Sequence, residues 1–224
     1  MAPIDRTAPP RETKADIEAA AVPTGKPLLV VDADEVLLEF AGHIARWLTA
    51  VGYEMRLTRY ELEGAIFPLG EPHPVDFSAA VELIRAFFEE ECAHQSALDG
   101  AVEAIGRLSR EATVVVLTNI PRTNRAARVR NLEGLGITAP VIANVGGKGR
   151  ALRMLAAKAA APVIFLDDSP SQIASAARHA EGVHRVHFMG SPFIRPVLQP
   201  AEEADQLAHD WTGAEAMIRR ELGL

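Results

Sequence analysis

Two pairs of aspartates stand directly after short apolar runs, in positions where they could bind a metal ion. Asp32 and Asp34 follow the run PLLVV, and Asp167 and Asp168 follow the run PVIFL. Burying one carboxylate there is costly, and a second like charge raises the cost unless a cation shares the site. Because Mg²⁺ prefers carboxylate, water and phosphate oxygens, the two pairs predict an Mg²⁺ site. The alternative is structural, because an acid at the end of a strand can lie in a solvated turn or cap the next helix.

Two further positions have side chains that could bind an anion. The apolar run TVVVL ends at Thr118 and Asn119, where a hydroxyl group and backbone N–H groups can donate hydrogen bonds. Lys148 stands in the glycine-rich segment GGKG, at the start of a predicted helix. A cation there opposes the helix dipole, and the need to neutralise a phosphate would justify its position. The alternatives are a β-turn at Thr118 and an ordinary exposed lysine.

Five short apolar or β-branched runs predict strands, and helical spacing of apolar residues separates most of them. Three of the runs are nearly continuous Val, Ile and Leu, which is typical of strands buried on both faces of a parallel sheet. A final amphipathic helix is predicted from Leu207 to Leu222. The alternation predicts a doubly wound α/β fold with a mainly parallel sheet. The predicted strands are Pro27–Asp32, Thr113–Leu117, Pro140–Val145, Pro162–Leu166 and Val183–Phe188.

The interval between the first two long runs breaks this alternation. It contains two helical stripes and the turn-rich segment PLGEPHP, but no convincing strand. It is too long for a simple crossover. We therefore predict a small all-helical cap over the carboxyl ends of the strands, where such folds bind ligands. The expected organisation is an α/β core over residues 27–36 and 100–224, a cap over 37–99, and a flexible tail over 1–26.

The composition limits the partners that the protein can have. The 224 residues carry a net charge of −7, which does not suit non-specific binding to a nucleic acid polymer, because such binding needs a basic face. No apolar run reaches the roughly 20 residues that a membrane span requires. The first 26 residues lack the apolar segment of a secretory signal peptide. Cys92 is the only cysteine, so we expect a cytoplasmic protein without intrachain disulfides. A homodimer is left open.

In their order and spacing, the four motifs resemble those of the haloacid dehalogenase superfamily. The resemblance spans nearly all of the chain after the predicted tail, and it implies a Rossmann-like core with a cap inserted after the first strand. One departure is Glu35, which stands where the family often has glycine and could add a carboxylate near the cap hinge. The matching residues, in motif order, are Asp32-Ala33-Asp34, Thr118, Lys148 and Asp167-Asp168.

The resemblance implies an Mg²⁺-dependent phosphomonoester hydrolase that works through an aspartyl-phosphate intermediate. Asp32 is the implied nucleophile, and Asp34 the implied general acid and then base. The implied Mg²⁺ ligands are Asp32, the backbone carbonyl of Asp34, and Asp167, with Asp168 in support. The implied phosphate-binding groups are Thr118, Lys148 and the N–H of Asn119.

The substrate is expected to be a small phosphorylated metabolite, such as a nucleotide or a sugar phosphate. Tyr60 is one candidate for a substrate contact from the cap, and Arg122 and Arg125 could contact a distal anionic group. One alternative is a phosphotransferase or mutase that uses the same intermediate. Another is a non-catalytic binding protein of the same fold, which would be expected to have lost at least one of the four motifs.

Overall fold

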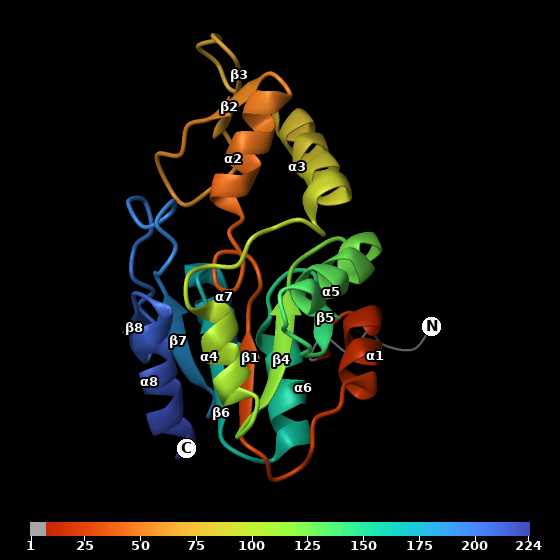
Figure 1. The fold of residues 1–224 in the computed structure, drawn as a ribbon, viewed down its shortest axis with the longest axis vertical. Helices are drawn as coiled ribbons and strands as arrows, with labels where there is room; N and C mark the ends of the chain where they lie inside the picture. Colours follow the sequence, from red (N-terminus) through yellow and green to blue (C-terminus); the bar gives the residue numbers. More distant parts are fainter. Residues whose placement is uncertain (1–7) are drawn as a thin grey trace.

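A six-stranded parallel sheet forms the centre of the molecule (Figure 1). The structure is a computed structural model, and it describes residues 8–224. All neighbouring strands of this sheet are parallel, and the order β5-β4-β1-β6-β7-β8 places the first strand between β4 and β6. The predicted α/β fold is therefore confirmed. The strands are β1 (Leu28–Val31), β4 (Thr113–Thr118), β5 (Val141–Ala143), β6 (Val163–Asp167), β7 (His184–Phe188) and β8 (Gln206–Ala208).

Helices cover both faces of this sheet. Because side chains alternate along a strand, Leu29 and Val31 pack in the hydrophobic cluster under α4, α5 and α8. Leu28 and Val30 pack in the opposite cluster, under α1, α6 and α7. Burial on both faces explains why the strands read as continuous apolar runs. The helices are α1 (Arg11–Ala19), α4 (Ala101–Leu108), α5 (Arg125–Gly134), α6 (Gly149–Ala159), α7 (Pro170–His179) and α8 (Trp211–Leu222), with a short 3₁₀ turn at Arg122–Asn124 before α5.

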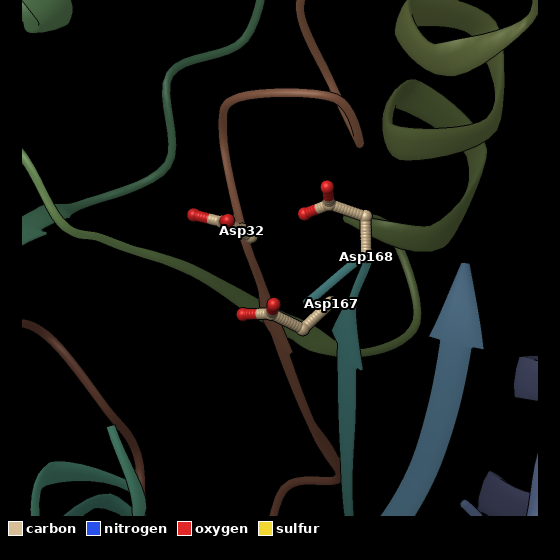
Figure 2. Close-up of side chains that lie close together, drawn as sticks. All are labelled: Asp32, Asp167 and Asp168. Atoms are coloured by element: carbon tan, nitrogen blue, oxygen red, sulfur yellow. The ribbon is translucent and has the colours of Figure 1, made fainter. Parts of the chain in front are cut away.

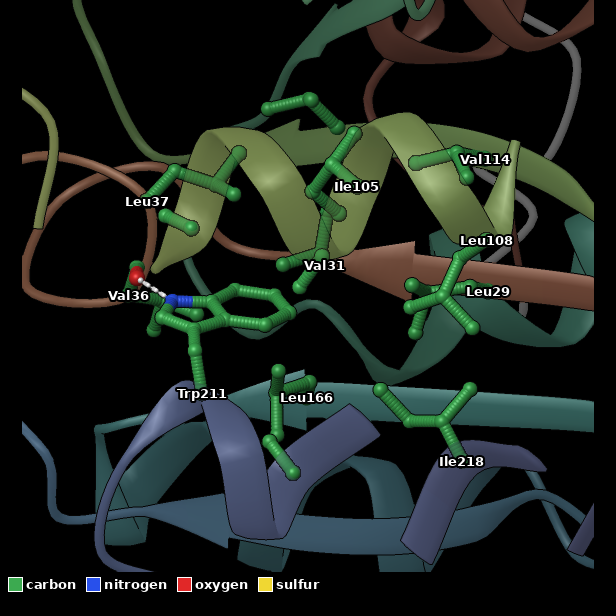
Figure 3. Close-up of a cluster of buried hydrophobic side chains, with 14 of the residues drawn as sticks. Leu29, Val31, Val36, Leu37, Ile105, Leu108, Val114, Leu166, Trp211 and Ile218 are labelled. Carbon is green, nitrogen blue, oxygen red and sulfur yellow. Dashed lines mark hydrogen bonds between the residues drawn. The ribbon is translucent and has the colours of Figure 1, made fainter. Parts of the chain in front are cut away.

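Trp211, the first residue of α8, fixes the loop that follows β1. Its side chain is 2% exposed, and its indole Nε1–H donates to the carbonyl oxygen of Val36 at 2.8 Å. Figure 3 shows the indole ring between side chains such as Val31 and Leu166 from the strands. A buried indole needs a partner for its N–H, and here the partner lies just beyond the acidic turn. The last helix therefore supports the segment that carries Asp32 and Asp34.

The chain before β8 and α8 differs from the prediction. Leu207 was expected on the last helix, but it lies on β8, which pairs with β7 at the edge of the sheet. The helix begins four residues later, where Asp210 caps it by accepting a hydrogen bond from the N–H of Gly213 at 2.7 Å. A three-residue edge strand has too few residues to show a period of its own, which is why it was missed.

The predicted flexible tail over residues 1–26 needs correction within the described residues; residues 1–7 lie outside them. Helix α1 packs against the face of the sheet, with Ile17 fully buried. Asp16 forms ion pairs with Arg122 and Arg125. The ammonium group of Lys158 donates to three carbonyl oxygens at the end of the helix, at 2.7–2.9 Å. The polar composition of this segment hid its role, because the few apolar residues that it has are the ones that pack.

The segment inserted after β1 forms a separate unit above the carboxyl ends of the strands (Figure 1). It consists of α2 (Ala41–Ala50), α3 (Phe77–Glu91) and a two-stranded antiparallel sheet of β2 (Tyr53–Met55) and β3 (Ile66–Pro68). This insertion, called the cap below, is therefore not all-helical as predicted. Strands of three residues leave no clear alternation in the sequence. None of the described helices is long and apolar enough to cross a membrane.

Candidate active site

Three buried carboxylates meet where β1 and β6 end. Asp32 follows β1, Asp167 is the last residue of β6 and Asp168 comes next. The two strands are neighbours in register, so their ends lie at the same edge of the sheet (Figure 2). One oxygen from each carboxylate lies within 4.8 Å of the others, an arrangement that could hold a metal ion. The structure thus brings together three of the four acids that the sequence predicted.

Lys148 connects two of these acids. Its Nζ lies 2.7 Å from Oδ1 of Asp32 and 2.7 Å from Oδ2 of Asp167. The residue is 1% exposed, so it is not an ordinary surface lysine. It stands immediately before α6, and Gly149 lets this helix pack closely on α7. A Cβ on Gly149 would lie 2.0 Å from the backbone oxygen of Ser175. The glycine therefore allows α6 to pack closely on α7, and this packing places Lys148 between the carboxylates.

The charges of this group fit a hard divalent cation. Burial raises the pKa of Asp32 to about 7, although Lys148 acts in the opposite direction. Burial, and then the negative charge of Asp167, raise the pKa of Asp168. Burial opposes the charge on Lys148, but the two adjacent carboxylates raise its pKa overall. The ammonium group of Lys148 contacts only two of the three carboxylates, and a divalent cation among their oxygens would compensate the remaining negative charge.

Two residues outside the motifs hold Asp168. Tyr60, from the cap, donates its hydroxyl to Oδ2 of Asp168 at 2.6 Å. His187, on β7, lies with Nε2 2.8 Å from the carbonyl oxygen of Asp168. The N–H of Ala201 donates to Nδ1 of His187 at 3.1 Å, so Nε2 carries the proton and donates to that carbonyl. Burial lowers the pKa of this histidine, which favours its neutral form. Sequence reasoning identified Tyr60 as a candidate and missed His187.

The Asp34 carboxylate does not join the three others. Its Oδ1 accepts hydrogen bonds from Nη2 of Arg128 at 2.8 Å and from Nε2 of Gln95 at 3.1 Å. Asp34 nevertheless lines the same crevice as Asp32 and Lys148. The implied role of its backbone carbonyl as a metal ligand stays a prediction. Arg128 and Gln95 were both missed, because nothing in their spacing relates them to the acidic motif.

Thr118 and Asn119 lie at the end of β4, in the same crevice. The Thr118 hydroxyl is buried and has no hydrogen-bond partner within residues 8–224, so it could donate to a bound anion. The Asn119 side chain is engaged, because its Nδ2 donates to the carbonyl oxygen of Gly146 and its Oδ1 accepts from Asn144, both at 2.9 Å. It ties the end of β4 to the glycine-rich segment before Lys148. The implied contact of the Asn119 N–H with phosphate stays a prediction.

Glu35, the departure from the family pattern, has a structural role. Its φ is 61°, in the left-handed region where a side chain is usually unfavourable. Its carboxylate is buried and accepts hydrogen bonds from the backbone N–H groups of Phe40 and Ala41, where α2 begins. Burial raises the pKa of Glu35 despite these bonds. The carboxylate therefore caps the first helix of the cap from the core side, which a glycine could not do.

A crevice between core and cap gives access to the site. It has a volume of about 340 Å³ and is lined by the candidate residues of the core other than Asp167, and by cap residues that include Tyr60 and Phe88. A second cavity of about 200 Å³ adjoins it, and both cavities are lined by Glu35, Phe40, Tyr60 and Leu62. The candidate acids other than Asp167 thus line the first of two adjoining cavities at the boundary between core and cap.

Comparison with known proteins identifies the fold. No protein-family model matches the chain, and no curated protein matches it in sequence. A HAD family hydrolase from Deinococcus radiodurans R1, solved with bound phosphate and sodium, is similar with a TM-score of 0.63 at 16% identity, over 89% of this chain and 97% of that one. YfnB from Bacillus subtilis, bound to magnesium, is similar with a TM-score of 0.61 at 13% identity, over 87% of this chain and 99% of that one.

The structural similarity also extends to a dehalogenase. The L-2-haloacid dehalogenase from Xanthobacter autotrophicus gives a TM-score of 0.52 at 12% identity, over 86% of this chain and 98% of that one. The chain therefore has the fold of the haloacid dehalogenase hydrolases, as the resemblance implied. Because this fold carries more than one reaction, the reaction has to be argued from the site.

Proposed function

We propose that this protein is a metal-dependent phosphomonoester hydrolase with Asp32 as its nucleophile. The arrangement of the Asp32 carboxylate carries the proposal. Its Oδ1 accepts a hydrogen bond from the N–H of Ala33 at 2.7 Å and contacts Lys148. No hydrogen bond to Oδ2 is found within the described chain, and Asp32 lines the crevice. One oxygen is thus held in place while the other is available to attack a substrate.

The proposed first step transfers the phosphoryl group to the protein. A bond forms between Oδ2 of Asp32 and phosphorus, the bond from phosphorus to the leaving oxygen breaks, and Asp34 gives a proton to that oxygen. Lys148 and the Thr118 hydroxyl stabilise the charge on the other phosphoryl oxygens. When bound by Asp32, Asp167 and Asp168, a divalent cation such as Mg²⁺ would supply further positive charge beside the phosphoryl group.

The second step returns the protein to its starting state. A water molecule attacks phosphorus, Asp34 accepts its proton, and the bond between phosphorus and Asp32 breaks to release inorganic phosphate. The presence of Asp34 supports a phosphatase over a dehalogenase, since attack on a carbon–halogen bond releases a halide that needs no proton.

The second cavity supports a proposal for the leaving group. Apolar side chains line most of it, together with Glu35 and Glu61, and no lysine or arginine is among its described lining residues. Arg122 and Arg125, which could have contacted a distal anionic group, form ion pairs with Asp16 of α1 instead. They therefore supply no positive charge to this cavity. We therefore propose a small phosphorylated alcohol that carries no second anionic group, because no cation in this cavity would compensate such a group.

Hydrolysis of p-nitrophenyl phosphate, measured with Mg²⁺ and with EDTA, tests the proposed function. We expect Mg²⁺-dependent turnover that Asp32→Asn abolishes and that the exposed Asp99→Asn leaves unchanged. Trapping of a phosphorylated protein, located on Asp32 by mass spectrometry, would identify the intermediate. Undiminished turnover by Asp32→Asn would remove the nucleophile assignment, and no turnover by the wild type on aryl or alkyl phosphates would remove the function.

A further inference from the structure

Arg128 is a fully buried cation that contacts one of the proposed catalytic acids. It lies on α5 with no exposed surface, and its Nη2 donates to Oδ1 of Asp34 at 2.8 Å. Its other donors, Nε and Nη1, are buried and have no hydrogen-bond partner within residues 8–224. A buried guanidinium with a single hydrogen bond is expensive, and such pairs add little stability over apolar residues of similar size. The position of Arg128 therefore calls for another explanation than stability.

A second donor acts on the same oxygen. Nε2 of Gln95, on the segment that returns from the cap to the core, donates to Oδ1 of Asp34 at 3.1 Å and to the carbonyl oxygen of Glu39 at 3.3 Å. The backbone carbonyl of Gln95 accepts from Asn131 at 2.8 Å. Asn131 is three residues after Arg128, so both lie on the same face of α5. One helix face thus holds the Asp34 carboxylate and the segment beside it.

This arrangement leaves the two oxygens of Asp34 in different situations. Oδ1 accepts both hydrogen bonds, whereas no hydrogen bond to Oδ2 is found in the described part of the chain. Asp34 lines the crevice that also contains Asp32 and Lys148, and 18% of its side chain is exposed. A carboxylate that exchanges a proton with a leaving group needs one oxygen that is accessible and a fixed orientation for it.

We propose that Arg128 is a positioning residue, which with Gln95 anchors Oδ1 of Asp34 and so presents Oδ2 to the leaving oxygen of the substrate. Arg128 itself does not contact the substrate. The inference rests on the proposed phosphatase function, in which Asp34 donates a proton during cleavage of the ester. In this role a cation behind the crevice, outside the four motifs, determines how efficiently Asp34 donates its proton to the leaving oxygen.

Substrates with different leaving groups separate this role from a structural one. p-Nitrophenolate leaves without being protonated, whereas the alkoxide of propyl phosphate needs a proton. We expect Arg128→Met to lower kcat/KM for propyl phosphate by about 10²-fold or more, the range of general acid catalysis. The value for p-nitrophenyl phosphate should change only a few-fold. Arg128→Lys, which keeps the charge, should recover part of the loss, and Arg130→Met, an exposed site on the same helix, should behave as the wild type.

A double-mutant cycle checks that Arg128 acts through Asp34. Asp34→Asn should show the same selective loss, and adding Arg128→Met to it should cause no further change in the ratio of the two kcat/KM values. Gln95→Met gives an independent variant, with a smaller selective loss, if Arg128→Met does not fold by circular dichroism. Equal losses on both substrates, or none, would overturn the positioning role while leaving the phosphatase function standing. A wild type inactive on both substrates would overturn the function and this role with it.

Discussion

The ammonium group of Lys148 lies 2.7 Å from the carboxylate of Asp32, which it reaches from the start of a helix that follows a different strand. The same ammonium lies 2.7 Å from Asp167. One lysine therefore holds two carboxylates from neighbouring strands together and limits their repulsion. The separate sequence motifs become one site through this residue, so its removal should affect both stability and activity.

Lys148→Met should strongly reduce activity and destabilise the protein. The variant keeps much of the side-chain volume but leaves Asp32 and Asp167 without their cation. We expect kcat to fall by about 10²–10³-fold, as for the loss of one group that stabilises transition-state charge. The free energy of unfolding should fall by about 3–5 kcal/mol, as when a buried ion pair loses one partner. Urea denaturation measures the second effect.

The control for this variant is Lys14→Met. Lys14 is paired with Glu18 on the surface of α1, and such exposed pairs contribute about 0.3–0.5 kcal/mol. A loss of stability from Lys148→Met no larger than that of the control would contradict the structural role of the buried lysine.

Divalent cations should stabilise the protein even without a substrate. The carboxylates of Asp32, Asp167 and Asp168 are held together by folding, so the folded state binds the cation better than the unfolded chain. At a concentration 100 times the dissociation constant, this contributes about 2.7 kcal/mol. We expect Mg²⁺ to raise the melting temperature in differential scanning fluorimetry and EDTA to reverse the rise. NaCl at equal ionic strength should have little effect.

Asp168→Asn should remove most of this rise. The amide oxygen can still accept the hydrogen bond from Tyr60, so the contact between core and cap is kept while one negative charge is lost. An unchanged response to Mg²⁺ in this variant would place the cation away from the three carboxylates.

The metal-free protein should become less stable as the pH rises from about 4 to about 7. Burial raises the pKa of Asp32 from 3.8 to about 7, so between these values the folded state binds more protons than the unfolded chain. The free energy of unfolding then decreases with increasing pH. The stabilisation is complete below the unfolded pKa and is lost as the pH passes the folded one. Urea denaturation at several pH values, in EDTA, measures the slope.

Asp32→Asn provides the reference for this slope, because residue 32 then cannot titrate. The difference in unfolding free energy between wild type and variant should decrease across the window, by about 1.4 kcal/mol for each unit of pKa shift. Saturating Mg²⁺ should make this difference nearly independent of pH, since the cation compensates the charge of the ionised carboxylate. A difference that grows with pH would show that Asp32 has a lowered pKa in the folded state.

The parts of the site that could be predicted from the sequence are those at the ends of strands. Apolar runs identified β1, β4 and β6, and parallel strands necessarily end at a common edge, so Asp32, Thr118 and Asp167 could be placed together. Lys148 could be recognised because a cation at a helix start is locally unfavourable. These are conflicts between a residue and its local structure, and such conflicts can be read from one sequence.

The residues that could not be predicted lie far along the chain from their partners. None of them conflicts with its own local structure. Arg128 on α5 reads as an ordinary helical arginine, and only the fold brings it to Asp34. His187 lies in a strand where its burial and its bond to Asp168 depend on β7 pairing with β6. Glu35 could be noticed as a departure, but its capping of α2 depends on how the cap is oriented. Partners that tertiary packing supplies need the three-dimensional structure.

The charge of the leaving group should decide which substrates the protein prefers. The second cavity is lined by apolar side chains with Glu35 and Glu61, and no lysine or arginine is among its described lining residues. Ethylene glycol monophosphate and phosphoglycolate form a matched pair, because they differ only in a hydroxymethyl or a carboxylate group at the far end. We expect kcat/KM to be at least about 10-fold higher for the first, since a carboxylate buried near two acids gains no compensating charge.

Leu57→Lys, which adds a cation to the lining of the second cavity, should reduce this ratio of kcat/KM values, whereas Leu57→Met should leave the ratio unchanged. A preference of the wild type for phosphoglycolate would mean that the leaving group binds outside the second cavity, for example in the part of the crevice that Ser169 and Gln172 line.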